Sequence, residues 1–315
     1  MSAAGAGAAA AGAAPAVTAV TVRVPAKVNA GLAVGAARPD GFHDLANVFL
    51  AVSLYDEVTA TPADTLTVTC SGPDADQVPL DRTNLAARAA ELLAARHGLD
   101  PAVHLHIAKN IPVAGGMAGG SADGAGALLA CDLLWGLGSS PAELLEICAE
   151  LGSDVPFSLV GGAALGTGRG EQLAPLESGI FHWVFAVADG GLSTPAVFRE
   201  FDRLAAAAGT EIPAPLAAPD LLAALAAGDP DALAATLLND LQAAALSLRP
   251  ELARTLDAGL DAGALAALVS GSGPTTAFLV RDPESAAKVA GALTASGTCR
   301  ATSVATSPAP GATRH

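Results

Sequence analysis

The chain has 315 residues, which allows two domains or one large one, and its formal net charge is −15. This excess of acid argues against nucleic acid or an anionic membrane as a partner, since both are themselves polyanions. Hydrophobic residues make up 51% of the chain but aromatic ones only 3%, and no stretch of about 18 strongly apolar residues predicts a membrane span.

The N-terminal segment and the cysteines indicate where the protein works. Residues 1–19 are mostly Ala and Gly and lack the basic segment and the apolar core of a secretory signal, so we expect a disordered tail. Cys70, Cys131, Cys148 and Cys299 form no CxxC pair. We therefore expect free thiols in a reduced, cytoplasmic protein.

Short β-type runs and turns follow the tail. Lys27 and Asn29 are two residues apart in one such run, so they share one face of an extended strand. The pair predicts either an exposed strand face or a site. Residues 38–41, Arg-Pro-Asp-Gly, predict a turn, because proline presets φ and glycine accepts a positive φ. Phe42 and His43 lead from this turn into the next strand.

The following segment mixes strands with a helix. We expect antiparallel strands at 56–60 and 66–70, and a helix at 85–96 that Asn84 caps. Residues 103–107 alternate strictly between apolar and polar side chains, which indicates a half-buried strand.

A glycine-rich stretch is the most informative part of the chain. Pro112 breaks the preceding strand, four glycines fall within 115–120, and Ser121 opens an apolar helix. Glycines let a backbone approach a ligand closely, and a helix N-terminus adds free N–H groups and partial positive charge. The pattern predicts a phosphate cradle, with a plain glycine-rich connector as the alternative. It is neither a P-loop, since no lysine precedes Ser121, nor a G-x-G-x-x-G fingerprint.

A single carboxylate stands out after the next predicted helix, which residues 140–143 cap and which ends near 151. Asp154 lies between this helix end, which repels anions, and the apolar run 155–160, which reads as a strand. It is either a turn residue or an acid placed for chemistry. The glycine-rich region 161–170 marks the expected junction between domains.

The C-terminal part predicts a further small α/β unit. We expect a strand at 183–188, followed by a turn into a helix that carries Phe198. Ala/Leu-rich helices follow over 201–262, and then strands at 264–269 and 276–280 on either side of a glycine-rich turn at 270–274. A helix at 283–295 and an irregular tail from about 306 complete the chain.

Residues 112–123 resemble the ATP-binding loop of the GHMP kinases, a family of small-molecule kinases. Five further blocks resemble the same family in the same order, namely residues 25–29, 38–43, 152–157, 239–241 and 270–273. The resemblance implies an α+β, two-domain GHMP kinase fold. Its N-terminal, ATP-binding domain (residues 20–168) would resemble domain 2 of ribosomal protein S5. Its C-terminal domain (residues 169–305) would be an α/β sandwich, followed by a disordered tail over 306–315.

The resemblance also implies a reaction. The block at 38–43 is the most discriminating, and it resembles members that read a cytidine diphosphate group. Such an enzyme transfers phosphate from ATP, with Mg²⁺, to the 2-hydroxyl of a methylerythritol linked to cytidine diphosphate, in the non-mevalonate route to isoprenoids. The alternatives are another GHMP kinase, acting on mevalonate, homoserine or a sugar, or an inactive nucleotide-binding regulatory member. Monomer and homodimer both stay open.

Site roles follow from the same resemblance. Asp154 would be the general base, and Lys27 would pair with it, keep it ionised and neutralise the transferred phosphoryl group. His43 would recognise the cytidine, with Phe42 and Phe198 as stacking partners, and Asn29 and Thr194 as polar contacts. The ATP phosphates would be held by Pro112, Val113, Ala114, Gly115, Gly116, Met117, Ala118, Gly119, Gly120, Ser121 and Ala122.

Three alanines of the loop depart from the family pattern, and the contacts of Ser121 and Asp123 stay open. Ala114, Ala118 and Ala122 stand where the family commonly has Gly, Gly and Ser. We expect alanine to fit there with helix-like φ and to keep the N–H groups. The hydroxyl of Ser121 is a candidate contact for Mg²⁺ or phosphate, and Asp123 is expected to stabilise the helix or to reach Mg²⁺, but the metal ligands are left unassigned.

Overall fold

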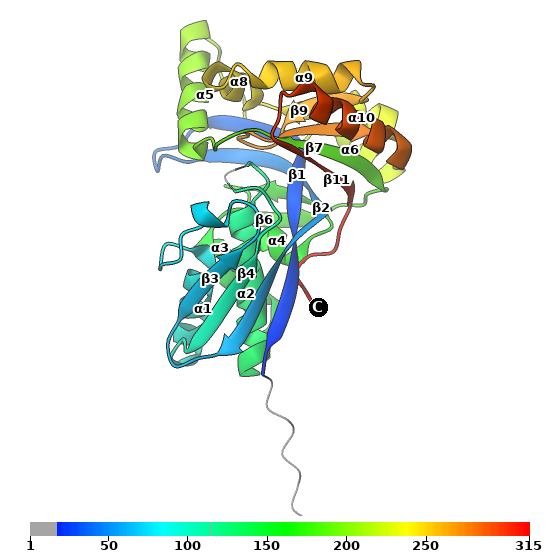
Figure 1. Ribbon diagram of the computed structural model, residues 1–315. Helices are drawn as coiled ribbons and strands as arrows, with labels where there is room; N and C mark the ends of the chain where they lie inside the picture. The colour runs from blue at the N-terminus through cyan, green and yellow to red at the C-terminus, as the bar shows by residue number, and fades with distance from the viewer. Residues whose placement is uncertain (1–17, 114) are drawn as a thin grey trace, which may run out of the picture.

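Two long strands, β1 (Val20–Ala37) and β2 (His43–Pro62), pair antiparallel and extend from one lobe of the molecule into the other (Figure 1). This computed structural model describes residues 18–113 and 115–315, so most of the expected N-terminal tail lies outside the described residues. β1 passes through Pro25, a residue that commonly ends a strand. The pairing register shifts between Pro25 and Ala26, and a bulge tolerates proline because one ladder N–H is dispensable there.

The first sheet has the order β12-β1-β2-β4-β3. β4 (Val103–Ala108) lies between β2 and β3 (Thr67–Ser71), antiparallel to β2 and parallel to β3, so the segments 56–60 and 66–70 run antiparallel, as expected, but are not direct partners. The helix α1 (Leu85–His97) lies between β3 and β4 in the chain and returns it to the same edge of the sheet, as a parallel pair requires.

Helices cover one side of this sheet in the lower lobe of Figure 1. They are α1, α2 (Gly119–Trp135), α3 (Pro141–Leu151) and α4 (Val155–Val160). Two predicted caps are confirmed: Asn84 accepts a hydrogen bond from the Ala86 N–H, and Ser140 accepts one from the Glu143 N–H.

The strand expected at 155–160 is wrong, because this segment is α4. A short apolar run does not distinguish a buried helix turn from a buried strand. Pro156 sits in the first turn of α4, where its missing N–H costs nothing, and Val155 and Phe157 are buried.

The second sheet has the order β11-β7-β10-β9 and forms the upper lobe with the later helices (Figure 1). Its strands are β7 (Phe181–Val187), β9 (Ala266–Val269), β10 (Thr276–Val280) and β11 (Ala301–Ser307). The helices of this half are α5 (Thr194–Ala208), α6 (Pro219–Ala227), α7 (Pro230–Ala234), α8 (Gln242–Leu248), α9 (Leu252–Asp261) and α10 (Pro283–Ser296).

Short strands tie the two halves of the chain together. β5 (Ala163–Thr167) pairs with β2, and β6 (Gln172–Pro175) pairs with β5 although it lies beyond the expected junction at 168. β8 (Leu238–Asn239), far along the chain, pairs in parallel with β1.

The expectation of a disordered C-terminal tail over 306–315 is wrong. β12 (Thr313–Arg314) pairs with β1, and the Ala309 N–H donates to the carbonyl of Ala51 at 2.9 Å. Its partners lie more than 250 residues away, so composition alone does not reveal them.

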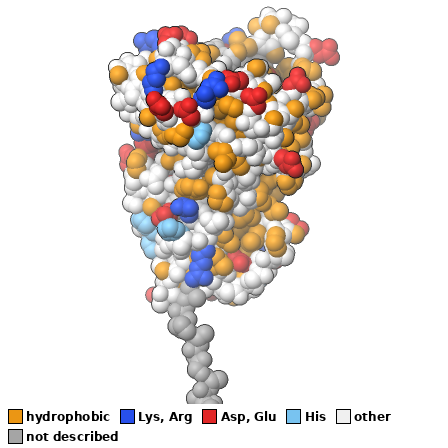
Figure 2. Space-filling view, turned by 90° about the vertical axis from the view of Figure 1, so that its right-hand side faces the viewer, with side chains coloured by type: hydrophobic (Ala, Val, Ile, Leu, Met, Phe, Trp, Pro, Cys, Tyr) orange, Lys and Arg blue, Asp and Glu red, His pale blue; other side chains and the backbone are white. Residues whose placement is uncertain are grey.

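The cysteines, the surface charges and the helices can each be compared with what the composition predicts. All four cysteines are free, as expected. On the face in Figure 2, acidic and basic side chains are interspersed over the upper lobe. None of the helices in the described part of the chain combines the length and the apolar character needed to cross a bilayer.

Candidate active site

A cavity of about 1030 Å³ gathers most of the residues singled out in the sequence. Its wall includes Lys27, Asn29, Phe42, His43, Gly115, Gly116, Ala118, Gly119, Gly120, Ser121, Asp154, Thr194 and Phe198. They come from positions between 27 and 198 of the chain, and lie on or beside β1, β2, α2, α4 and α5. A concave site with few, convergent polar groups is the usual form of a small-molecule site.

Lys27 occupies the centre of a polar cluster in this wall. Its ammonium donates hydrogen bonds to Asn29 Oδ1 (2.8 Å) and to the Gly116 carbonyl (3.0 Å), and it lies 3.7 Å from Asp154 Oδ2. Burial lowers the pKa of Lys27, and the Asp154 carboxylate opposes that shift. The exposed-face reading of the Lys27–Asn29 pair is therefore wrong, because both residues are buried.

Asn29 is itself held in place. Its Nδ2 donates to Asn47 Oδ1 at 2.5 Å, and both side chains are buried. β1 and β2 present these two amides from adjacent strands. The chain of Lys27, Asn29 and Asn47 leaves the ammonium little freedom to rotate away from Asp154.

Asp154 is the residue just before α4, with φ −92° and ψ −10°. Its side chain makes no capping hydrogen bond to α4 and is 31% exposed. The carboxylate is thus available at the cavity instead of being used by the helix. This position favours the chemical role over the turn role for Asp154.

Residues 112–121 are here called the glycine loop, and of these residues 115, 116 and 118–121 line the cavity. The first intrahelical bond of α2 runs from the Ala122 N–H to the Ala118 carbonyl at 2.8 Å. The N–H groups of residues 119–121 therefore have no partner within the helix, and they carry the positive end of its dipole. A Cβ placed on Gly120 would meet no atom within 4 Å, so open space lies before this helix end. A helix end of this kind is typical of anion-binding sites.

The loop is anchored from the opposite side by the glycine-rich turn at 270–274. Gly116 has φ +76°, and a Cβ on it would lie 2.0 Å from the Ser270 carbonyl oxygen. Ser270 Oγ in turn donates to the Gly116 carbonyl at 3.2 Å, and the Thr275 N–H donates to the Gly115 carbonyl at 3.3 Å. Only glycine allows this contact between the two turns.

Ala118 is strained, contrary to expectation. It has φ 59° and ψ 30°, the left-handed region, whereas we expected helix-like φ at the alanines of the loop. For a residue with a Cβ this conformation costs about 1–2 kcal/mol. The reason is that Ala118 precedes the first turn of α2 and redirects the chain into it.

A second cluster surrounds His43 at the start of β2. Nε2 of His43 lies 2.9 Å from Asp202 Oδ1, and the His43 ring lies 4.9 Å from the Phe198 ring with a tilt of 34°. Phe42 is 49% exposed, with the Arg169 guanidinium 5.1 Å from its ring centroid. Aromatic faces and a fixed imidazole together suit a flat heteroaromatic ring.

Comparison with known proteins fits this geometry. The model of the GHMP kinases N terminal domain matches residues 84–162, and that of the GHMP kinases C terminal domain matches residues 221–299. The chain belongs to the GHMP kinase family. The expected α+β, two-domain fold of these kinases is thereby confirmed.

Sequence relatives in this family share one name. A protein of Streptomyces avermitilis named 4-diphosphocytidyl-2-C-methyl-D-erythritol kinase is 77% identical over 295 residues, which cover 93% of this chain and 99% of that protein. A protein of Thermobifida fusca with the same name is 59% identical over 305 residues, covering 94% and 98%.

Solved GHMP kinases have the same fold. The crystal structure of a 4-(cytidine 5'-diphospho)-2C-methyl-D-erythritol kinase is 32% identical, with a TM-score of 0.75 over 91% of this chain and 99% of that one. A homoserine kinase from Cytophaga hutchinsonii reaches the same TM-score at 19% identity, covering 97% and 100%. The second likeness shows the fold alone.

Some residues expected at the phosphates of this GHMP kinase do not line the cavity. Pro112, Met117 and Ala122 are buried, and Met117 packs in the core, so their side chains face away. Val113 is not in the wall either. Ala114 lies outside the described residues.

The sequence missed several residues of the wall. Asp202, the partner of His43, follows Phe198 by four residues on α5, a spacing that places both on one helix face and that could have revealed it. Arg169 and Arg199 add cations to the wall, and Ser272 shares a hydrogen bond of 2.8 Å with Thr194. No local pattern marks the two arginines, whereas Ser272 lies in the block 270–273, which the sequence singled out without giving it a role.

The structure reduces the set of candidate metal ligands that the sequence left open. Asp123 is buried, lies 2.9 Å from Lys109 Nζ and is not in the cavity wall. In residues 18–113 and 115–315 no three or more His, Cys, Asp or Glu side chains are arranged to hold a metal ion. Of the two residues considered for the metal, Ser121 is at the wall and Asp123 is not, and the wall also carries the Asp154 carboxylate. Such a sparse set suits Mg²⁺, which keeps waters and binds largely through substrate phosphates.

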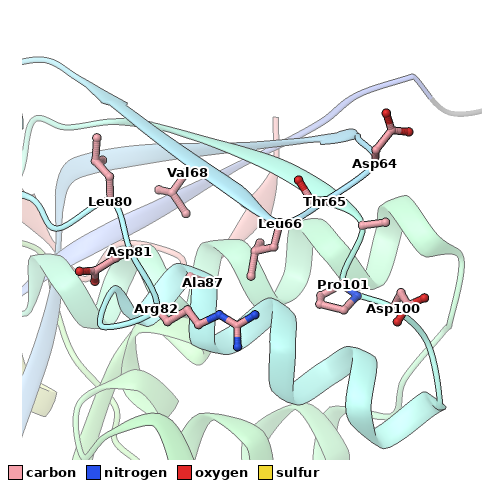
Figure 3. Close-up of a pocket in the computed structure, with 11 residues that line it drawn as sticks. Asp64, Thr65, Leu66, Val68, Leu80, Asp81, Arg82, Ala87, Asp100 and Pro101 are labelled. Carbon is pink, nitrogen blue, oxygen red and sulfur yellow. The ribbon is translucent and has the colours of Figure 1, made fainter.

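A second hollow, of about 440 Å³, lies between β3 and α1. Figure 3 shows its aspartates, Asp64, Asp81 and Asp100, standing apart from one another around it. Its one arginine, Arg82, pairs with Glu91 and is largely exposed. The polar groups do not converge, so this hollow is not the site.

Proposed function

We propose that this GHMP kinase transfers the γ-phosphoryl group of ATP to the 2-hydroxyl of 4-diphosphocytidyl-2-C-methyl-D-erythritol, which yields the 2-phosphate and ADP. The name shared by relatives at 59–77% identity supports the reaction. The observation that carries it is the position of Lys27, whose ammonium contacts both the glycine loop at Gly116 and the carboxylate of Asp154.

In this proposal the proton moves to Asp154. The substrate oxygen forms a bond to the γ-phosphorus, its proton passes to the Asp154 carboxylate, and the bond between the γ-phosphorus and the bridging oxygen of ADP breaks. The side chain of Asp154 is partly exposed at the cavity and free of helix capping, so it can reach a bound hydroxyl.

Lys27 and the first turn of α2 would stabilise charge. Negative charge spreads over the oxygens of the transferred group in the transition state. The buried ammonium of Lys27 contacts the glycine loop at Gly116, and the N–H groups of residues 119–121 have no partner within α2, so both offer fixed positive charge at the loop. Mg²⁺ bound with the nucleotide would add further neutralisation, and the Ser121 hydroxyl and the Asp154 carboxylate are oxygens of the wall that would hold it.

The cluster around His43 would read the cytosine. Phe42 and Phe198 offer ring faces for stacking, and His43 offers a polar ring edge. Arg169 and Arg199 also line the cavity and could neutralise the diphosphate of the substrate. These local cations matter because the protein as a whole carries a net charge of −15.

We also propose that the enzyme works in the cytoplasm with its thiols reduced. The four cysteines are free, and burial raises the pKa of Cys131 and of Cys148 to about 12. Such thiols serve as core residues and not as nucleophiles.

The decisive test is ADP release with a panel of acceptors. We expect turnover with 4-diphosphocytidyl-2-C-methyl-D-erythritol and background rates with mevalonate, homoserine and galactose. Turnover of mevalonate or homoserine instead would reassign the substrate within the family. ADP binding without turnover of any acceptor would indicate a regulatory member.

A further inference from the structure

A buried ion cluster lies at the base of the glycine loop, outside the cavity wall. Lys109 stands three residues before the loop, and Asp123 follows it in the first turns of α2. The Lys109 ammonium donates to Asp56 Oδ2 and, at 2.9 Å, to Asp123 Oδ2. The side chain of Lys109 is 1% exposed, that of Asp56 is 0% exposed and that of Asp123 is 4% exposed.

Asp56, on β2, also holds the two residues directly before the loop. Its Oδ1 accepts hydrogen bonds from the backbone N–H groups of Asn110 (2.6 Å) and Ile111 (2.8 Å). One carboxylate thus binds two consecutive backbone groups and the Lys109 ammonium. These bonds fix where the chain leaves the sheet and enters the glycine loop.

The far end of the loop meets the same ammonium. A Cβ on Gly119, the first residue of α2, would lie 3.1 Å from Lys109 Nζ. The backbone of Lys109 is fixed too, because its N–H donates to the Ser71 carbonyl at 2.8 Å. Lys109 therefore joins three parts: the edge strand β3, the start of the loop and the beginning of α2.

Stability alone is a poor explanation of this cluster. Removing charges from water costs several kcal/mol per ion, and apolar replacements of buried ion clusters are often neutral or stabilising. Burial raises the pKa of Asp123 to about 8 in spite of the attraction to Lys109, and Asp123 Oδ1 has no hydrogen-bond partner within the described residues. Burying these charges costs free energy, but the hydrogen bonds of the cluster are directed at the two ends of one loop.

We propose that Lys109, Asp56 and Asp123 are positioning residues of the nucleotide site, which set the distance between the start of the glycine loop and the first turn of α2. This rests on the proposed function, in which the N–H groups of residues 119–121 hold the ATP phosphates. The cluster touches no ligand itself. Its effect is on nucleotide binding and not on the site around His43.

The test is Asp56→Asn, measured by calorimetry with ADP and by steady-state kinetics with both substrates. Asparagine has one carbonyl oxygen, so it cannot accept from both the Lys109 ammonium and the two backbone N–H groups with equal geometry. Hydrogen bonds to charged groups are among the stronger ones in proteins, so we expect ADP affinity to fall and the KM for ATP to rise by about tenfold or more. The KM for the cytidylyl substrate should change by less than about twofold, since the cavity wall around His43 is intact.

Asp132→Asn is the matched control. Asp132 is a buried carboxylate on the same helix, at the opposite end of α2, and accepts a hydrogen bond from the Ser139 N–H at 3.0 Å. We expect it to lower Tm without changing either KM. If Asp56→Asn does not fold, Asp123→Asn serves instead, because it keeps an oxygen toward Lys109 and changes only the charge.

The outcomes separate the inference from the proposed function. A loss of ADP affinity in Asp56→Asn with an unchanged KM for the cytidylyl substrate supports a positioning role. Unchanged ADP affinity, or an equal rise of both KM values as in a merely structural defect, overturns it. Wild-type protein that binds ADP but phosphorylates no acceptor refutes the proposed function, while the calorimetric comparison still decides the role of the cluster.

Discussion

The Lys27 ammonium and the Asp154 carboxylate lie 3.7 Å apart, although 127 residues separate them in the chain. The distance is longer than that of a tight ion pair, because Asn29 Oδ1 and the Gly116 carbonyl take the hydrogens of the ammonium at 2.8 and 3.0 Å. The Asp154 carboxylate therefore lies near a cation but does not form a tight ion pair with it. A carboxylate in that state can still accept a proton from a substrate.

Asp154→Asn should lower kcat by at least about 100-fold, the usual contribution of a general base. The amide keeps the shape of the side chain but cannot take up the hydroxyl proton. Because Asp154 makes no capping bond to α4, Tm and ADP affinity should change little. Asp231→Asn, at a surface pair with Arg281, controls for loss of a carboxylate. A kcat near that of the wild type would remove Asp154 from the role of base.

The protonation of Lys27 should set an alkaline limit to activity. Burial lowers its pKa below 10.5, so the ammonium loses its proton at a lower pH in the folded protein than in the unfolded chain. Activity that needs the ammonium should decline as pH rises through this lowered value. The sign for stability is opposite: the cost of burying the charge is present at low pH and is relieved as pH rises from the lowered pKa toward 10.5.

The pH profile of Lys27→Arg tests this assignment. Arginine stays charged to above about pH 12, so whatever activity remains should lack the alkaline decline in kcat/KM seen in the wild type. The guanidinium does not fit the ammonium site, so a lower rate is expected at every pH. The same alkaline decline in the variant would show that another group titrates.

Local features of the chain were predictable, and distant pairings were not. The spacing of Lys27 and Asn29 placed both side chains on one strand face, and their hydrogen bond confirms it. Asn84 and Ser140 cap the expected helices, because a cap is decided within three residues. The contact of His43 with Asp202 spans 159 residues, and no local rule encodes it.

The incorrect predictions also fall where the local sequence does not determine the conformation. The six residues of α4 are too few for a helical period to differ from an apolar strand. The C-terminal strand β12 is only two residues long, so its order comes from β1 and not from its own propensity. Ala118 shows the limit of an alanine-for-glycine argument, because the tertiary path of the loop imposes a left-handed φ on it.

His43 and Asp202 should act together in substrate binding. A carboxylate only accepts hydrogen bonds, so Nε2 of His43 carries a hydrogen and the ring orientation is fixed. His43→Ala removes the imidazole beside Phe198 and should raise the KM for the cytidylyl substrate by about tenfold or more, while ADP affinity is kept. Asp202→Asn should produce a smaller rise of the same KM, since the amide still accepts from Nε2.

The double variant decides whether the two residues are coupled. If Asp202 acts by orienting His43, then Asp202→Asn adds no further rise of KM once His43 is alanine. Additive effects would mean that Asp202 contacts the substrate independently. An unchanged KM in His43→Ala would count against cytidine recognition by this cluster.

The contact between the glycine loop and the turn at 270–274 should be essential to nucleotide binding. In Gly116→Ala the Cβ would lie 2.0 Å from the Ser270 carbonyl oxygen, and φ +76° disfavours alanine by about 1–2 kcal/mol. The loop must shift, so ADP affinity should fall by at least about tenfold and Tm should decrease. Gly291→Ala is the control, because that position in α10 has open space around a Cβ and no positive φ, and alanine there should be neutral or stabilising by about 0.5–1 kcal/mol. Normal ADP affinity in Gly116→Ala, with Gly291→Ala unchanged, would show that the loop does not bind the phosphates through its backbone.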